Sequence, residues 1–442
     1  MAIGNWAFGG PIRKLIDIQS PTERAFLVGA PRKGSDDAIH VEEHLEELER
    51  LADTAGAQII GKTIQRIEAP TPNFYLGQGK VESLKEEMSA AGATLLLFDE
   101  SLTPLQGAKL EKALGLRVMD RTEVILDIFA TRARSREAKL QVELEQLEYL
   151  LPRLTRMWTH LSRIRGGIGL RGPGETQLET DRRVIRRKIS TLRKRLKDVA
   201  EHRANQRQGR RDLPTAALVG YTNAGKSSLL KALSGQDVFI EDRLFATVDT
   251  LAREVDVGEG YRYRITDTVG FIRKLPHHLV ASFRATLEEA EDADLLLHVI
   301  DASHPGWEEQ LDVVETETTS VSPKRVIHVF NKADQLPDPA AFLLLVRERY
   351  PHAILTRCPA HGAQRTAHVE DLRRALRTSA QALRPIAEIR VPVTNGKLLA
   401  TLHRDAEILE QKQTNGVVTL RARIEARLLG RLRQEGVEVV LG

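Results

Sequence analysis

Eight consecutive residues in the middle of the chain have the types and spacing of a phosphate-binding loop. Residues 220–227 read Gly-Tyr-Thr-Asn-Ala-Gly-Lys-Ser, which matches G-x-x-x-x-G-K-S between an apolar run and a helical pattern. The backbone N–H groups of such a loop surround the phosphates of a nucleotide at a helix N-terminus. We therefore expect Lys226 to contact the β- and γ-phosphates and Ser227 to bind Mg²⁺. The other residues predicted to hold the nucleotide here are Gly220, Tyr221, Thr222, Asn223, Ala224, Gly225 and Ser228.

A second motif, Asp267-Thr268-Val269-Gly270, follows 41 residues after Lys226 and directly after the predicted strand Arg262–Thr266. It would place the Asp267 carboxylate near the metal and a backbone N–H of Gly270 near the γ-phosphate. A nucleotide switch also needs a hydroxyl that reaches Mg²⁺ only when the γ-phosphate is present. We assign this role to Thr247, with Thr250 as the less favoured alternative. Lys226, Thr247, Asp267 and Gly270 are thus the predicted catalytic residues, and Ser227, Thr247 and Asp267 the predicted Mg²⁺ ligands.

The third motif, Asn331-Lys332-Ala333-Asp334, lies at the end of the predicted strand Arg325–Asn331. The Asp334 carboxylate can accept hydrogen bonds from the N1–H and the exocyclic amine of guanine. Adenine lacks that pair of donors, and a site built in this way discriminates by roughly 10⁴. Lys332 would pack its stem over the base, and Asn331 would tie this loop to the phosphate loop. The three motifs together predict hydrolysis of GTP to GDP and phosphate.

Two residues near these motifs bear on the rate of hydrolysis. Phe271 follows Gly270, at the place where Ras-like enzymes carry the glutamine that orients the attacking water. Phenylalanine cannot do this, so we expect slow intrinsic hydrolysis that depends on an outside component or on another main-chain group. Asn223 in the phosphate loop could help to hold K⁺ beside the phosphates, or could only shape the loop, and both interpretations remain open.

The elements that must position these residues form an α/β chain of several domains. Strands alternating with helices over residues 1–131 predict a small α/β domain with a mainly parallel sheet. Residues 211–382 have the pattern of a doubly wound domain that binds ligand at its strand carboxyl ends. A β-α-β-β-α-β pattern over residues 383–442 predicts a small ferredoxin-like α+β domain.

Between the first two domains, residues 132–210 predict a helical hairpin. Leu178, Ile185, Leu192 and Val199 recur every seven residues, which is typical of a helix seam packed against a partner. In the first arm we expect Pro152 to kink or restart the helix. The arms are joined by the glycine-rich segment 163–175, which carries three arginines.

Charge is distributed unevenly along the chain. The net charge is +4, but residues 152–211 contain 18 Lys/Arg and 5 Asp/Glu, a local net charge of +13. A basic block in an otherwise acidic chain favours a polyanion, such as nucleic acid, over a merely solvated helix face. A single cysteine suits a reducing cytosol, and the lack of any apolar run of ~18 residues predicts no membrane span.

Several stretches together resemble the HflX family of translation-associated GTPases. They are residues 75–82, 150–154, 157–162, 171–183, 244–247 and 267–272. The resemblance implies an N-terminal HflX domain with a helical hairpin, a Ras-like GTPase domain and a small C-terminal domain. It also implies a cytoplasmic, monomeric protein that binds the large ribosomal subunit and splits or rescues stalled or idle ribosomes, notably under stress. The expected rRNA contacts at the hairpin tip are Arg163, Arg165 and Arg171.

The chain departs from the family pattern in two loops. Asp249-Thr250-Leu251 stands where the family commonly has Asp-Pro-Thr. The usual Ser-Ala-Lys loop, whose backbone N–H contacts guanine O6, is replaced by residues 358–362, Cys-Pro-Ala-His-Gly. If Pro359 takes the alanine position, that N–H is missing, and either guanine affinity is reduced or Ala360 serves after a one-residue shift. Cys358 and Ala360 are the residues that the resemblance places beside the base.

Two alternatives to a ribosome-bound GTPase remain. The first is a regulatory GTPase whose hairpin binds a protein, which predicts docking that depends weakly on salt and survives charge reversal of the basic block. The second is an RNA-binding module in which the nucleotide is only structural, which predicts that Lys226→Ala changes neither RNA binding nor function.

Overall fold

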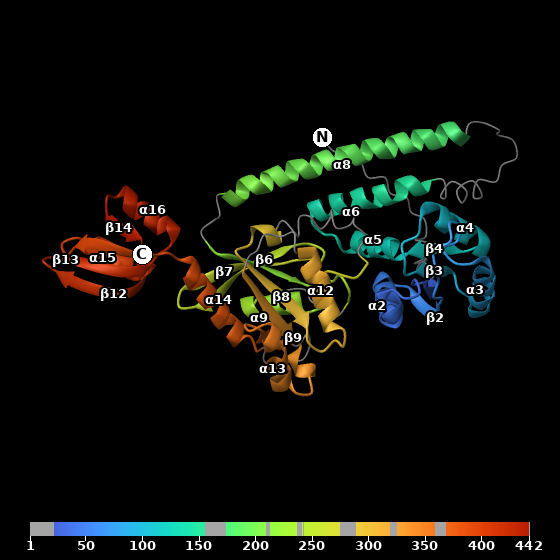
Figure 1. Cartoon of the computed structure of the whole chain (residues 1–442). Coiled ribbons are helices and arrows are strands. Elements are labelled where there is room, and N and C mark those ends of the chain that lie inside the picture. Colours follow the sequence, from blue (N-terminus) through green and yellow to red (C-terminus); the bar gives the residue numbers. More distant parts are fainter. Residues whose placement is uncertain are drawn as a thin grey trace, which may run out of the picture.

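The computed structural model describes residues 22–154, 174–208, 213–236, 241, 243–274, 289–318, 325–358 and 368–441. Three separate β-sheets, each with its own helices, follow one another along the chain, and a long helix pair links the first to the second (Figure 1). The predicted α/β multidomain fold is confirmed. No helix in the ranges above is long and apolar enough to cross a membrane.

The first sheet has the strand order β2-β1-β3-β4, and every neighbouring pair is parallel, as predicted. Its strands are β1 (Arg24–Gly29), β2 (Gln58–Ile64), β3 (Leu95–Phe98) and β4 (Arg117–Asp120). Its helices are α1 (Asp36–Ile39), α2 (Val41–Ala55), α3 (Gln78–Ala91), α4 (Pro104–Leu114) and α5 (Arg121–Arg132). The helical stripe Val41, Leu45, Leu48 and Leu51 of α2 is buried. Its burial removes apolar surface from water and holds α2 against the sheet.

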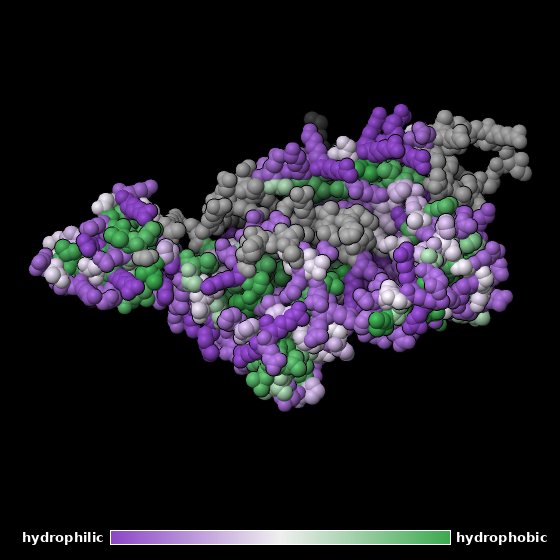
Figure 2. Space-filling model, viewed as in Figure 1, coloured by the Kyte–Doolittle hydropathy of each residue, from purple (hydrophilic) through white to green (hydrophobic). Residues whose placement is uncertain are grey.

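The helix pair consists of α6 (Arg136–Leu150), which continues into the short 3₁₀ helix η1 (Leu151–Arg153), and α8 (Gly174–Gln208). The predicted effect of Pro152 is confirmed, because the α-helix ends at Leu150. Leu144 of α6 and Ile189 and Leu192 of α8 form a buried seam. Figure 2 shows hydrophilic side chains along the outer face of α8 and hydrophobic ones beneath it.

The second sheet has the order β10-β9-β8-β5-β7-β6, in which only β6 is antiparallel to its neighbour. Its strands are β5 (Thr215–Gly220), β6 (Leu251–Gly258), β7 (Tyr261–Asp267), β8 (Leu295–Asp301), β9 (Arg325–Asn331) and β10 (Ile354–Leu355). Its helices are α9 (Lys226–Ser234), α12 (Trp307–Thr318), η2 (Ala333–Gln335), α13 (Pro339–Arg349) and α14 (Glu370–Leu383). The three chemical motifs follow β5, end β7 and end β9, so they meet at one edge of the sheet.

The third sheet is antiparallel with the order β12-β13-β11-β14, which is the predicted ferredoxin-like arrangement. Its strands are β11 (Ile386–Pro392), β12 (Glu407–Thr414), β13 (Val417–Arg423) and β14 (Glu438–Leu441). Its helices are α15 (Gly396–Asp405) and α16 (Ala426–Gln434). This domain contacts the middle one through a hydrogen bond between Tyr261 and Glu407 and through Arg384, which lies over the Tyr261 ring.

Candidate functional site

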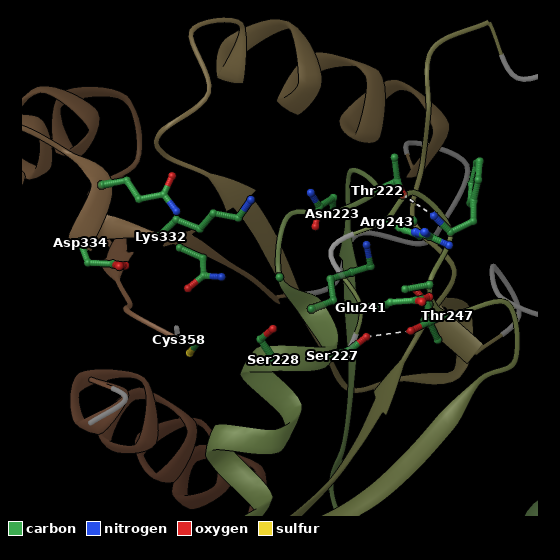
Figure 3. Close-up of a pocket in the computed structure, with 18 residues that line it drawn as sticks. Thr222, Asn223, Ser227, Ser228, Glu241, Arg243, Thr247, Lys332, Asp334 and Cys358 are labelled. Atoms are coloured by element: carbon green, nitrogen blue, oxygen red, sulfur yellow. Dashed lines mark hydrogen bonds between the residues drawn. The ribbon is translucent and has the colours of Figure 1, made fainter. Parts of the chain in front are cut away.

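A single pocket brings together most of the residues predicted to bind nucleotide (Figure 3). Its wall includes the predicted residues Thr222, Asn223, Gly225, Lys226, Ser227, Ser228, Thr247, Gly270, Asn331, Lys332, Asp334 and Cys358. Three further lining residues, Phe245, Ala246 and Thr268, lie within stretches singled out in the sequence but were given no role of their own. Glu241, Arg243 and Gln335 also line the pocket and were not identified from the sequence. Thr250, the alternative to Thr247, is not among the lining residues. Ala360 and the arginines Arg163, Arg165 and Arg171 lie outside the described residues.

Lys226 is buried at the start of α9, inside the loop that precedes it. Its Nζ donates hydrogen bonds to the carbonyl oxygens of Tyr221 at 2.8 Å and Gly220 at 3.1 Å. Burial lowers the pKa of Lys226 to about 8, against the opposing effect of the nearby Asp267 carboxylate. Gly220 and Tyr221 therefore serve this site through their backbone. The ammonium group is held where it can exchange these carbonyls for phosphate oxygens.

Two glycines allow the loops around Lys226 to approach closely. Gly225 has a φ of +93°, and a Cβ added there would lie 2.2 Å from Nδ2 of Asn331. At Gly270 an added Cβ would lie 2.6 Å from the Cα of Thr222 and 2.8 Å from Nζ of Lys226. Any side chain at either position would push the loops apart, which is why both motifs need glycine here.

Three oxygen-bearing side chains converge beside the phosphate loop. The Ser227 hydroxyl donates to Oδ2 of Asp267 at 2.5 Å and lies 2.8 Å from Oγ1 of Thr247. Asp267 is fully buried, which raises its pKa, and its Oδ1 has no hydrogen-bond partner among the residues that the structure describes. A buried carboxylate oxygen without a partner is costly, and a hard cation with oxygen ligands relieves that cost. The three residues therefore fit Mg²⁺, whose positive charge would compensate the negative charge of the buried Asp267 carboxylate.

The side of the pocket that is predicted to hold guanine is built from the loops after β9 and β10. Nδ2 of Asn331 donates to the carbonyl oxygen of Ala224 at 3.0 Å, which is the link to the phosphate loop expected from the sequence. Lys332 has a φ of +60°, and its Nζ lies 2.6 Å from Oδ2 of Asp301. Burial and the Asp334 carboxylate raise the pKa of Cys358 to about 12, so its thiol is neutral. These loops are tied together before any base is bound.

Phe271 does not line the pocket. Its ring is buried in the core, and its backbone pairs with the phosphate loop through Thr222 N–H to Phe271 O at 2.7 Å and Phe271 N–H to Gly220 O at 3.1 Å. The residue therefore holds the loop that carries Gly270 in place. It offers nothing to an attacking water molecule, in agreement with the expectation from the sequence.

The segment after Gly270 is bonded to the N-terminal domain. Nζ of Lys274 lies 2.5 Å from Oδ2 of Asp99 and 3.5 Å from Oε1 of Glu100, both at the carboxyl end of β3. Asp99 is buried, which raises its pKa while Lys274 opposes the rise. Oδ1 of Asp99 also accepts a hydrogen bond from Arg121 at 2.7 Å. The Tyr221 hydroxyl, hydrogen bonded to Glu47 of α2, adds a second link between the domains.

The segment around Thr247 is bonded to the base of the hairpin. The Asp249 carboxylate accepts hydrogen bonds from the backbone N–H groups of Arg134 and Ser135 at 2.8 and 3.0 Å, and from the Ser135 hydroxyl at 2.6 Å. Ser135 is itself the N-cap of α6. The rings of Phe245 and Phe129 meet edge to face with centroids 4.8 Å apart. Both segments that would sense a γ-phosphate are thus bonded to neighbouring parts of the chain, one to the N-terminal domain and the other to the base of the hairpin.

Comparisons with known proteins agree with this arrangement. Residues 42–130 match the family described as "GTP-binding GTPase N-terminal", residues 132–210 "GTP-binding GTPase Middle Region" and residues 215–332 "50S ribosome-binding GTPase". The GTPase HflX of Magnetococcus marinus is 43% identical over 432 residues, covering 95% of this chain and 98% of that protein. The GTPase HflX of Caldanaerobacter subterraneus subsp. tengcongensis is 50% identical over 319 residues, covering 71% and 73%. The GTPase HflX of Escherichia coli is 42% identical over 387 residues, covering 86% and 90%.

Proposed function

Because the chain belongs to the HflX family of GTPases, we propose that it binds the large ribosomal subunit in its GTP state and couples GTP hydrolysis to the dissociation or rescue of ribosomes, notably under stress. In this proposal the protein works in the cytoplasm as a monomer. Residues 215–332 match the family described as "50S ribosome-binding GTPase", which supports the choice of partner.

The observation that carries the proposal is the bonding of Asp249 to the N-cap of α6. Thr247, the proposed Mg²⁺ ligand, is two residues away from this carboxylate. Thr247, whose Oγ1 lies 2.8 Å from the Ser227 hydroxyl, would hold Mg²⁺ together with that residue. Any shift of Thr247 between nucleotide states would be passed to Asp249 and to the end of the hairpin that Asp249 holds. Loss of the phosphate after hydrolysis releases the same connection. The nucleotide thereby controls how the hairpin is presented to its partner.

The outer face of α8 has the charge that rRNA requires. Arg186, Arg187, Lys194 and Arg195 are exposed there, whereas Lys188 and Arg193 are paired with Glu143 and Glu148 of α6. Phosphate contacts by lysine and arginine give affinity that falls steeply with salt. We propose that the exposed group contacts rRNA and that the paired group holds the hairpin together, with Arg163, Arg165 and Arg171 making further contacts.

In the nucleotide pocket we propose the following division of labour. Lys226 and the phosphate loop hold the triphosphate, while Ser227, Thr247 and Asp267 hold Mg²⁺, which supplies charge to the phosphates. The N–H of Gly270 senses the γ-phosphate. The guanine base is read by Asn331, Lys332 and Asp334. K⁺ beside Asn223 is a further proposal.

The test is GTP hydrolysis with and without purified large ribosomal subunits at two salt concentrations. We expect strong stimulation that weakens at high salt, and we expect Arg187→Glu/Lys194→Glu to reduce both the stimulation and its salt dependence. Lys85→Glu, an exposed charge reversal on α3, serves as the matched control and should change neither. Tight GTP binding without stimulation would contradict the proposal and favour a protein partner for the hairpin.

A further inference from the structure

The cationic side chains that line the nucleotide pocket include one that lies outside the three motifs. Phosphoryl transfer spreads negative charge over the γ-phosphate oxygens, and enzymes of this class stabilise it with positive groups placed in advance. Within the part of the chain that the structure describes, three cationic side chains line the pocket, namely Lys226, Arg243 and Lys332. Lys332 is paired with Asp301 on the guanine side, and Lys226 belongs to the phosphate loop. Arg243 is the one of these three cations that lies outside the phosphate loop and the motif at residues 331–334.

Arg243 lies on the phosphate side of the pocket. Figure 3 places it beside Thr222 and near Thr247, opposite the guanine-side residues Asp334 and Cys358. Arg243 lies two residues before Phe245, whose backbone N–H donates to Oγ1 of Thr222 at 3.0 Å. This bond holds the segment that carries Arg243 close to the phosphate loop. A long, exposed guanidinium side chain at this position can reach the γ-phosphate.

The same arginine lines a second cavity on its other side. That cavity is formed by α2 and the start of β2, and three carboxylates, Glu46, Glu49 and Asp53, line it together with one other cation, Arg50. Arg243 forms no hydrogen bond or ion pair with any residue in the described ranges, although carboxylates line this cavity. It therefore stands between two sets of negative groups, one permanent and one supplied by the nucleotide.

We propose that Arg243 is a catalytic arginine supplied by the chain itself, which binds the γ-phosphate as hydrolysis proceeds. In this step a water oxygen forms a bond to the γ-phosphorus, and the bond from that phosphorus to the β–γ bridging oxygen breaks. The proton of the water passes to the released phosphate. Arg243 stays protonated throughout and neutralises the charge that develops on the transferred group. The acidic wall of α2 attracts the same side chain away from the phosphates and slows the unstimulated reaction.

This inference concerns GTP hydrolysis alone and stands apart from the ribosome proposal, since it is tested without ribosomes. It also predicts how the chain responds to K⁺. A bound K⁺ near Asn223 and the Arg243 guanidinium would supply positive charge to the same phosphates. Removing the arginine should therefore make hydrolysis more dependent on K⁺ than it is in the unmodified protein.

The experiment is single-turnover hydrolysis by the full chain with Mg²⁺ and GTP, in K⁺ and in Na⁺ buffers. Arginines of this kind contribute about 10³–10⁵ in rate when fully engaged, so Arg243→Ala should slow hydrolysis at least about tenfold even if the residue is engaged only part of the time. Arg243→Lys should recover little, because it lacks the planar fork. Binding of GDP and of a non-hydrolysable GTP analogue should stay within about threefold, which also shows that the variant is folded. Arg262→Ala, an exposed arginine on β7 outside the pocket, should hydrolyse GTP at the normal rate.

A second variant tests the acidic wall. Glu46→Gln/Glu49→Gln/Asp53→Asn should raise the unstimulated rate severalfold, and should have no effect when combined with Arg243→Ala. A rate for Arg243→Ala within threefold of the unmodified protein would overturn the catalytic assignment. An acceleration by the triple change that persists without Arg243 would overturn the proposed effect of the acidic wall on Arg243.

Discussion

The nucleotide pocket and the junction between the first two domains are both polar and buried, yet they are specified in different ways. The pocket is formed by short runs of neighbouring residues, such as residues 220–227, because the ligand dictates which groups must lie close together. At the junction, Lys274 and Asp99 are 175 residues apart in the sequence. No ligand constrains this pair, so other pairs of opposite charge could take the same two positions. Chemistry imposed by a ligand leaves a sequence motif, whereas chemistry between two domains leaves none.

The largest effect should come from the pocket. Lys226→Ala removes the ammonium that we propose contacts the phosphates, and loss of one such donor costs about 10²–10³ in rate. We expect hydrolysis to fall by about 10³ and GTP affinity to fall with it. The measurement is single-turnover hydrolysis together with nucleotide titration, with Lys85→Ala as a control on an exposed helix face. Normal turnover by Lys226→Ala would contradict the role assigned to this lysine.

A substitution at the junction should lower the free energy of unfolding and leave nucleotide affinity unchanged. Lys274→Met leaves the fully buried Asp99 carboxylate without one of its two cationic partners. Breaking a buried pair costs about 3–5 kcal/mol, and we expect a value near the lower end, about 3 kcal/mol, because Arg121 remains. Urea unfolding measures the loss, and Asp99→Asn/Lys274→Met should recover part of it. A large change in GDP affinity would show that the junction, like the pocket, determines nucleotide binding, which would contradict the comparison.

Base recognition should change in kind at Asp334. Asp334→Asn replaces a carboxylate acceptor by an amide, so its NH₂ faces the donors of guanine, whereas the extra carbonyl of xanthine can accept from it. Each hydrogen bond to a charged group is worth about 1.5–3 kcal/mol, so GTP affinity should fall about 10²-fold or more. Competition between GTP and XTP measures the switch. Unchanged preference for GTP would mean that another group reads the base.

The smallest effect concerns pH at the junction. Burial raises the pKa of Glu100 to about 7 from an ordinary 4.5, against the opposing charge of Lys274. The folded state then holds this proton more tightly than the unfolded state, so the stabilisation is complete below about pH 4.5 and is lost as the pH rises through about 7. Unfolding midpoints between pH 5 and 8 should therefore decline less steeply for Glu100→Gln than for the unmodified protein. Parallel curves would contradict this.

The sequence predicted much of the architecture because its patterns are local. Strand β9 has the predicted bounds, Arg325–Asn331, since it is a largely apolar run with clear ends. Strand β6 was not predicted, because only Val255 and Val257 alternate with exposed residues there and the first half of the strand has no buried side chain. The two-residue strand β10 is too short to leave any pattern.

Within the site, the motif residues came together as expected, whereas Arg243 and Glu241 were not identified. A charged residue in an irregular segment has no periodicity, and only the fold shows which cavity it faces. The same holds for Glu47 and Tyr221, whose contact joins residues 174 positions apart. Long-range pairs of this kind become visible only once the domains are in place.

The length of α8 has a mechanical consequence. Its 35 residues correspond to a rigid rod of ~52 Å, at a rise of 1.5 Å per residue. One end leads into β5, the strand before the phosphate loop, and the other end lies far from it (Figure 1). A tilt of ~5° about the near end therefore sweeps the distant end through ~4.5 Å, close to the ~5.4 Å pitch of a helical turn. In the proposed function, the rod would convert an atomic-scale rearrangement at a bound phosphate into a displacement large enough to lose one set of distant contacts and gain another.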